Sequence, residues 1–92
     1  MNIVAEMSLY PLNNQPVKHI IDFILELRRR PGLEVVTNQL STQLRGPFET
    51  VTVAVNECMR EAMDADNTVV LVVKYLNIDV EIGRQPTLTP DA

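Results

Sequence analysis

The chain is poor in the residues from which most catalytic and metal sites are built. Its 92 residues include one histidine, one cysteine, three glycines and no tryptophan. His19 and Cys58 alone cannot supply the ligand spacing of a zinc site. So few glycines also leave no glycine-rich phosphate loop. A single cysteine excludes an internal disulfide and is typical of a reducing compartment.

Positive charge and long apolar runs are also scarce. The formal net charge is −4, which opposes binding to nucleic acid. The one basic run, Arg28–Arg30, suits the C-terminal end of a helix, where cations favour the helix dipole. No apolar run approaches the ~18 residues that suggest a membrane span. The N-terminal stretch lacks the basic region of a signal peptide, so we expect a cytoplasmic protein.

Two kinds of hydrophobic spacing are present instead. Residues 3–10, IVAEMSLY, alternate between apolar and more polar side chains, which predicts a strand. Residues 16–30 have helical spacing, and Pro31-Gly32 ends that helix. The apolar residues expected to form its buried stripe are Val17, Ile20, Ile21, Ile24, Leu25 and Leu27.

The second half of the chain repeats this pattern. Short strands are predicted over 33–38 and 39–46, separated by a tight turn near Asn38-Gln39. A second helix begins with Pro47 as its first residue. A last strand covers 68–77, and residues 78–83 either extend it or form a short extra ribbon. The expected buried stripe of the second helix is Val51, Ala54, Val55, Cys58, Met59 and Ala62.

The order strand, helix, strand, strand, helix, strand predicts a ferredoxin-like βαββαβ sandwich of the α+β class. Its four-stranded antiparallel sheet would have the order 4-1-3-2, with both helices on one face. We expect a single ferredoxin-like domain over residues 1–83 and a C-terminal tail over 84–92.

The last strand is apolar on both faces, which is typical of a strand covered on both sides. Val70 and Val72 alternate with Val69, Leu71 and Val73. A two-layer sandwich leaves one face of the sheet open. We therefore expect a homo-oligomer, a dimer or a tetramer, that associates through the sheet.

Polar residues occupy the centre of the predicted sheet. Glu6, Ser8 and Tyr10 would share the open face with Ser41, Gln43 and Arg45. Thr42 would lie beneath the helices, between Leu40 and Leu44. A buried hydroxyl left unpaired costs about 1–3 kcal/mol. Either Thr42 bonds to a neighbouring group and the open face packs in the oligomer, or a small polar ligand binds between helices and sheet or at a subunit boundary.

No specific catalytic constellation is found. His19 has no Asp or Cys at a spacing that would make it a base. Cys58 lies on an apolar stripe, where an inert core thiol is expected. Glu57, Glu61 and Asp64 are explained by a solvated helix face. We therefore expect a protein that is not an enzyme.

Two segments, EMSLYPL (6–12) and LSTQLRGPFETVTVAVNECMREA (40–62), resemble the YkoF-like thiamine/hydroxymethylpyrimidine-binding family. They are also similar to the related small single-domain thiamine-binding family. The resemblance covers about residues 3–75. It implies a ferredoxin-like domain that binds thiamine or its pyrimidine half without catalysis or cofactor, for vitamin transport, salvage or buffering.

The resemblance also implies ligand-binding residues. Ser8 and Tyr10 match the first-strand element, and Ser41 and Thr42 match the Ser-Thr of the second. Arg45-Gly46 match the end of that strand, where the glycine is expected to be structural. The last strand lacks a match beyond its apolar run and Lys74. The predicted ligand-binding residues are Thr42, Ser41, Ser8 and Tyr10.

The chemistry is compatible with this resemblance. An aminopyrimidine offers donors and acceptors that short hydroxyls can pair with, and Met7, Tyr10 or Phe48 could flank its ring. Because Thr42 and Ser41 face opposite ways, Thr42 favours a pocket beneath the helices and Ser41 one at a subunit interface. Two alternatives are a regulatory domain that senses another small molecule, such as an amino acid, and a purely structural oligomeric module.

Overall fold

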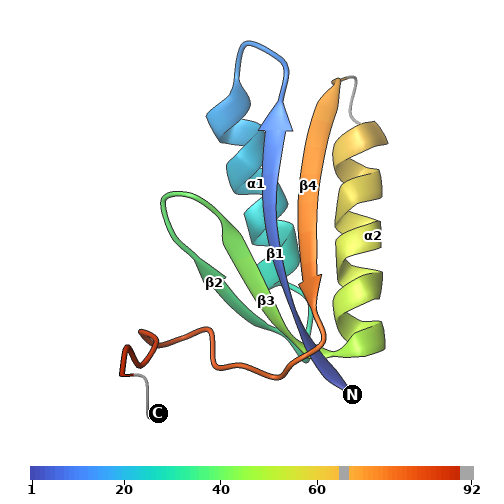
Figure 1. Cartoon of the computed structure of the whole chain (residues 1–92). Helices are drawn as coiled ribbons and strands as arrows, with labels where there is room; N and C mark the ends of the chain where they lie inside the picture. The colour runs from blue at the N-terminus through green and yellow to red at the C-terminus, as the bar shows by residue number, and fades with distance from the viewer. Residues whose placement is uncertain (65–66, 90–92) are drawn as a thin grey trace.

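A computed structural model describes residues 1–64 and 67–89. Strands and helices follow in the predicted order along the chain (Figure 1). They are β1 (Asn2–Pro11), α1 (Pro16–Arg28), β2 (Glu34–Thr37), β3 (Thr42–Pro47), α2 (Phe48–Asp64) and β4 (Val69–Leu76).

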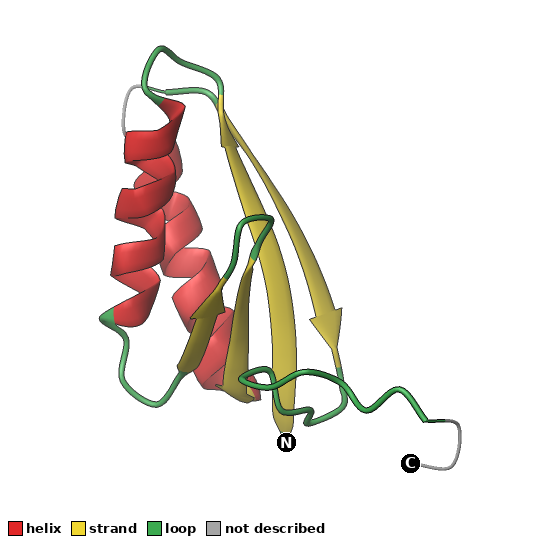
Figure 2. Cartoon of the chain, turned by 90° about the vertical axis from the view of Figure 1, so that its left-hand side faces the viewer, coloured by secondary structure: helices red, strands yellow, loops and turns green. Residues whose placement is uncertain are grey.

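The strands form one antiparallel sheet in the order β2-β3-β1-β4. Both helices lie on the same face of this sheet, as Figure 2 shows. Read from the other edge, the order is 4-1-3-2, so the predicted ferredoxin-like α+β fold is confirmed. In the described residues, no helix is long and apolar enough to cross a membrane.

The core lies between the helices and the sheet. Alternate residues of β1 point under the helices, as its sequence predicts, and Ala5 and Met7 there are 0% and 2% exposed. Leu44 of β3 and Val51 of α2 are fully buried beside them. β1 is central because it pairs with β3 on one side and with β4 on the other.

The face that α1 turns to the core differs from the prediction. Phe23 and Leu27 are buried, whereas Val17, Ile21 and Leu25 are 66%, 49% and 51% exposed. Apolar residues occur on nearly every side of this helix, so more than one stripe fits helical spacing. Burying the large Phe23 ring removes more apolar surface from water than burying a valine would.

Helix α2 follows the prediction more closely. Val51, Ala54, Val55 and Cys58 are buried, while Met59 and Ala62 are half-buried. The helix begins at Phe48. Pro47 is therefore not the first helical residue but the last residue of β3, where it pairs with Asn2.

The turn between β2 and β3 is longer than predicted. It spans Asn38–Ser41, here called the hairpin tip. The Asn38 side-chain oxygen accepts hydrogen bonds from the backbone N–H groups of Leu40 (2.9 Å) and Ser41 (3.1 Å). Such Asn turns compete with strand pairing. Leu40, which was predicted to lie under the helices, is consequently 89% exposed at the tip.

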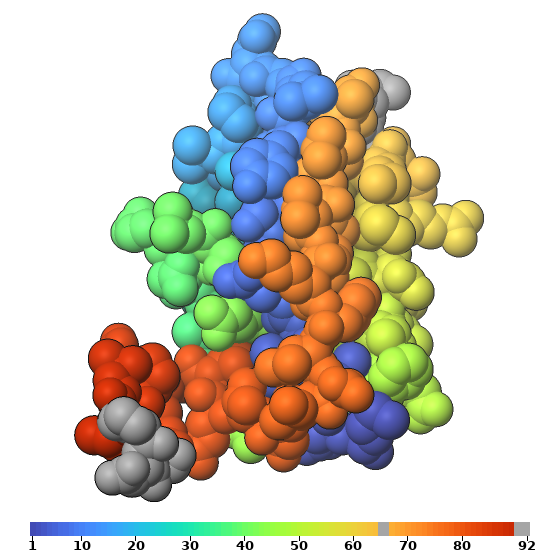
Figure 3. Space-filling model, viewed as in Figure 1, coloured from blue at the N-terminus to red at the C-terminus, as the bar shows by residue number. Residues whose placement is uncertain are grey.

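Residues 77–89 continue from β4 as irregular chain across one end of the open face (Figures 1 and 3). The predicted strand extension or ribbon over 78–83 is therefore wrong. The Arg45 Nε–H donates to the Asp79 carboxylate at 2.8 Å, which lowers the pKa of Asp79. Val4 on this end is only 7% exposed. At the other end, Tyr10, Val70 and Val72 are 53%, 46% and 47% exposed.

Candidate functional site

A pocket of about 350 Å³ lies beside the second half of β1. We call it the hairpin pocket. Strand β3 pairs with β1 only as far as Met7, whereas β1 continues to Pro11 beside β4 alone. The hairpin therefore stops short of the end of β1, as Figure 1 shows. Helix α1 and the hairpin tip enclose the space that this leaves.

All four residues predicted to bind ligand line the hairpin pocket: Thr42, Ser41, Ser8 and Tyr10. The apolar part of the lining comes from β1 and α1, and includes Met7 and Phe23. Among the residues that the structure describes, no charged side chain lines it. Phe48, predicted as a possible ring neighbour, is not in this lining, because it starts α2 and bonds through its N–H to Met1 at the opposite end of β1. The remaining lining residues are Leu9, Ile20, Ile24, Thr37, Asn38, Gln39 and Leu40.

Thr42 forms part of the floor of the pocket beneath the helices. It is 4% exposed, and its hydroxyl lies 3.1 Å from the hydroxyl of Thr37, its cross-strand partner. The predicted position beneath the helices is correct, and the buried hydroxyl has a partner, as its desolvation requires.

Ser41 and Ser8 use their hydroxyls to hold the hairpin. Ser41 donates to the Glu6 carboxylate at 3.1 Å, and Ser8 donates to the Leu40 carbonyl at 3.2 Å. Glu6 in turn lies 3.4 Å from the Lys74 ammonium. Both serines therefore fasten the hairpin tip to β1. Ser41 and Thr42 point to opposite faces yet line one pocket, because the pocket wraps the edge of the sheet where β3 begins.

Sequence reasoning missed three polar residues of the pocket lining, Thr37, Asn38 and Gln39, and of these Thr37 lies on the pocket floor beside Thr42. The Thr37 hydroxyl lies beside the Thr42 hydroxyl only because these two residues pair across the hairpin. The predicted tight turn at Asn38-Gln39 would pair Thr37 with another residue. Asn38 was the available signal, because an asparagine side chain readily bonds to the backbone two residues further on.

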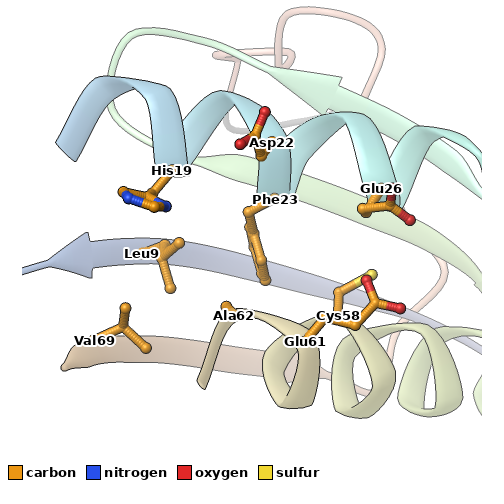
Figure 4. A pocket seen from close by; sticks show the side chains of 9 residues that line it. All are labelled: Leu9, His19, Asp22, Phe23, Glu26, Cys58, Glu61, Ala62 and Val69. Carbon is orange, nitrogen blue, oxygen red and sulfur yellow. The ribbon is translucent and has the colours of Figure 1, made fainter. Parts of the chain in front are cut away.

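A second pocket, of about 180 Å³, lies between α1 and α2. We call it the interhelix pocket. In Figure 4 the Phe23 ring points from α1 toward α2, with Leu9 and Val69 to its left. Asp22, Glu26 and Glu61 stand at the rim. Each has a basic neighbour: Lys18 at 3.1 Å, Arg29 at 2.8 Å and Arg30 at 3.4 Å respectively.

The potential catalytic residues meet in the interhelix pocket without forming a catalytic arrangement. Cys58 is 1% exposed, and desolvation raises the pKa of its thiol, against a lowering by nearby Arg30. A buried thiol with a raised pKa is a poor nucleophile. Within residues 1–64 and 67–89, no cluster of three or more His, Cys, Asp or Glu side chains could hold a metal ion.

No protein-family model matches the chain, and no curated protein matches it either. Solved structures do. The hypothetical protein MJ1052 from Methanocaldococcus jannascii is 25% identical, with 95% of this chain and 88% of that chain covered and a TM-score of 0.71. TM0486 from Thermotoga maritima, described as a candidate thiamine biosynthesis/salvage protein, is 17% identical, with 89% and 91% covered and a TM-score of 0.74.

A domain of unknown function, DUF77, from Bacillus cereus is also similar. It is 17% identical, with 89% of this chain and 84% of that chain covered and a TM-score of 0.69. The chain thus shares its fold, over nearly its whole length, with small proteins of the DUF77 and thiamine-salvage type.

Proposed function

We propose that this protein belongs with the YkoF-like and small single-domain thiamine-binding proteins. It binds thiamine or its hydroxymethylpyrimidine moiety reversibly in the hairpin pocket, for vitamin transport, salvage or buffering in the cytoplasm. One observation carries the proposal: the four residues that match the family motif, although they come from separate segments, line a single pocket. The fold shared with TM0486 supports it.

The lining of the pocket suits a flat, neutral heterocycle. Apolar side chains such as Met7, Ile24 and Phe23 can cover the two faces of a ring, and Tyr10 stands at the rim. The hydroxyls of Thr37 and Thr42 offer hydrogen bonds to the ring edge.

Binding occurs without chemistry on the ligand. The polar groups that line the pocket in the described chain are hydroxyls and amides. The Ser41 hydroxyl bonds to the Glu6 carboxylate at 3.1 Å, but that carboxylate is also paired with the Lys74 ammonium and lies outside the lining. His19 and Cys58 lie in the interhelix pocket, on the other side of Phe23. Nothing in the described lining therefore activates a nucleophile.

We also propose that the uncovered end of the open face associates with a second copy, giving a dimer or tetramer. Tyr10, Val70 and Val72 form an exposed apolar strip beside the free edge of β4. Light scattering should give a multimeric mass, and Val72→Lys should lower that mass. Val53→Lys, at an equally exposed valine of α2, should not. A monomeric wild-type protein at micromolar concentration contradicts this part.

The binding proposal is tested by calorimetry with hydroxymethylpyrimidine and with thiamine. We expect saturable heat from the wild-type protein and at least about tenfold weaker binding by Thr42→Val, because the variant leaves polar ligand atoms unpaired. Thr52→Val is the matched control, since the Thr52 hydroxyl bonds within α2 to the Phe48 carbonyl at 2.9 Å. No heat at millimolar ligand from ligand-free protein refutes the proposal.

The two alternatives predict other results. A domain that senses an amino acid would have to bury an ammonium and a carboxylate in a pocket without charged lining, which is costly. A thermal-shift screen would reveal it, because only the true ligand raises the melting temperature by mass action. A purely structural module predicts that replacing Ser41 and Thr42 by Ala and Val changes stability alone.

A further inference from the structure

The floor of the hairpin pocket holds two hydroxyls side by side. Thr37 and Thr42 are the last cross-strand pair before the hairpin tip, and their Oγ1 atoms lie 3.1 Å apart. Thr42 is almost fully buried, and Thr37 is half-buried. Both residues line the pocket, and the half-buried Thr37 is the more accessible of the two.

Two bonded hydroxyls present a complementary pair of functions. Each hydroxyl carries one proton and two lone pairs. When one donates to the other, the acceptor still has its own proton to give, and the donor still has lone pairs to offer. Either Thr37 or Thr42 can be the donor. The pair therefore offers one donor and one acceptor next to each other, in an order that can be reversed by rotating two O–H bonds.

Charged side chains do not recognise the ligand in place of this hydroxyl pair. As far as the structure describes the chain, the pocket lining includes no acidic or basic side chain. The nearest carboxylate on β1, that of Glu6, is occupied by the Ser41 hydroxyl and by the Lys74 ammonium at 3.1 Å and 3.4 Å. Recognition in this pocket has to come from neutral hydrogen bonds and shape.

We propose that Thr37 is a specificity-determining residue, and that the Thr37–Thr42 hydroxyl pair reads a ligand edge with one donor next to one acceptor. The ring nitrogen and exocyclic amino group of an aminopyrimidine form such an edge. An oxo-pyrimidine presents the same two functions in reverse order. The hydroxyl pair accepts both and rejects an edge that lacks one of the two functions. This inference rests on the proposed function and names the chemistry that selects the ligand.

The experiment compares three ligands on one protein by calorimetry. They are hydroxymethylpyrimidine, its analogue with oxo in place of the amino group, and its analogue with methyl in place of the amino group. Wild-type protein should bind the amino and oxo ligands within about threefold of each other. It should bind the methyl analogue at least about tenfold more weakly, since the acceptor function of the hydroxyl pair then has no donor on the ligand.

Variants of Thr37 then test whether its hydroxyl causes the difference in affinity between the amino and methyl ligands. Thr37→Val should weaken binding of the amino ligand about 5- to 10-fold and should narrow the difference between amino and methyl ligands, as coupled groups do in a double-mutant cycle. Thr37→Ser keeps the hydroxyl and should bind like the wild type. It also provides a folded comparison if the valine variant is unstable.

The outcomes separate the two proposals. If wild-type protein binds no pyrimidine, both fall. If it binds hydroxymethylpyrimidine but Thr37→Val binds equally well, or the methyl analogue binds as tightly as the amino ligand, the role of Thr37 is overturned and the proposed function stands. If the oxo analogue is rejected, the reversible reading of the edge is overturned.

Discussion

The hairpin pocket and the interhelix pocket lie on the same side of the sheet and share two walls, Leu9 and Phe23. They differ in charge. The interhelix pocket has carboxylates at its rim, and each of these already lies against a basic side chain of the same chain. The hairpin pocket has no charged lining, but its two threonine hydroxyls share one bond and keep further capacity to donate and accept. The neutral pocket therefore keeps more hydrogen-bonding capacity that is not already used within the chain.

The largest expected effect on stability comes from truncating Phe23, which lines both pockets. Phe23→Ala removes a ring that is 5% exposed and joins the two pockets into one cavity. We expect the free energy of unfolding to fall by about 3–5 kcal/mol, the usual cost of such a deletion in a core. Urea unfolding measures it.

Ile21→Ala serves as the control for this variant. Ile21 lies on the same helix and is 49% exposed, so its truncation should change the free energy of unfolding by only about 0.5 kcal/mol. Equal stability of the two variants would contradict the expected contribution of the Phe23 ring to the core.

A smaller effect should appear with pH in the interhelix pocket. Burial raises the pKa of the Cys58 thiol above its ordinary value of 9.0. As pH rises above about 9, the unfolded chain releases this proton before the native protein does, so the free energy of unfolding decreases. Cys58→Ala has no thiol to titrate, so its free energy of unfolding should decrease less between pH 7 and pH 10. Parallel urea titrations at the two pH values give the comparison.

The background in that experiment is Tyr75, whose pKa is also raised by desolvation and which is present in both proteins. Any alkaline loss that remains in Cys58→Ala is assigned to it and to other groups. Identical losses in both proteins would mean that the thiol titrates as it does in the unfolded chain.

The smallest effect is expected from the charges at the interhelix rim. Arg30 lies beside Glu57 and Glu61, and its side chain is 24% exposed. Arg30→Gln should cost about 1 kcal/mol or less, and the difference should shrink in high salt. Lys18→Gln, at a pair with side chains 65% and 57% exposed, should cost still less. A large, salt-independent loss for Arg30→Gln would show that this rim does more than neutralise its own carboxylates.

The fold was predictable because its two kinds of spacing are unambiguous in most elements. Alternation in β1 and helical spacing in α2 each allow only one buried face. The order of strands and helices along the chain then selects the ferredoxin-like sandwich. Helix α1 was not predictable in detail. With isoleucine, leucine and phenylalanine on several sides, its sequence permits more than one buried face, and only packing against β1 and α2 selects Phe23 and Leu27.

The candidate site was predictable in part for a similar reason. The alternation of β3 correctly placed Thr42 beneath the helices, and the motif pointed to Ser8, Tyr10 and Ser41, which line the same pocket. Thr37 was missed because a cross-strand partner depends on turn length, and the hairpin tip is longer than the predicted turn. Local spacing does not determine that length.

Strand β1 serves two surfaces along a single stretch of chain. Met7 and Leu9 line the hairpin pocket from below, while Glu6 and Ser8, between and beside them, fasten the hairpin tip. A slip of this stretch by one residue against β3 and β4 would exchange the two sets at once, burying a carboxylate and exposing the core. The register of β1 against both neighbouring strands is therefore constrained by the two surfaces together.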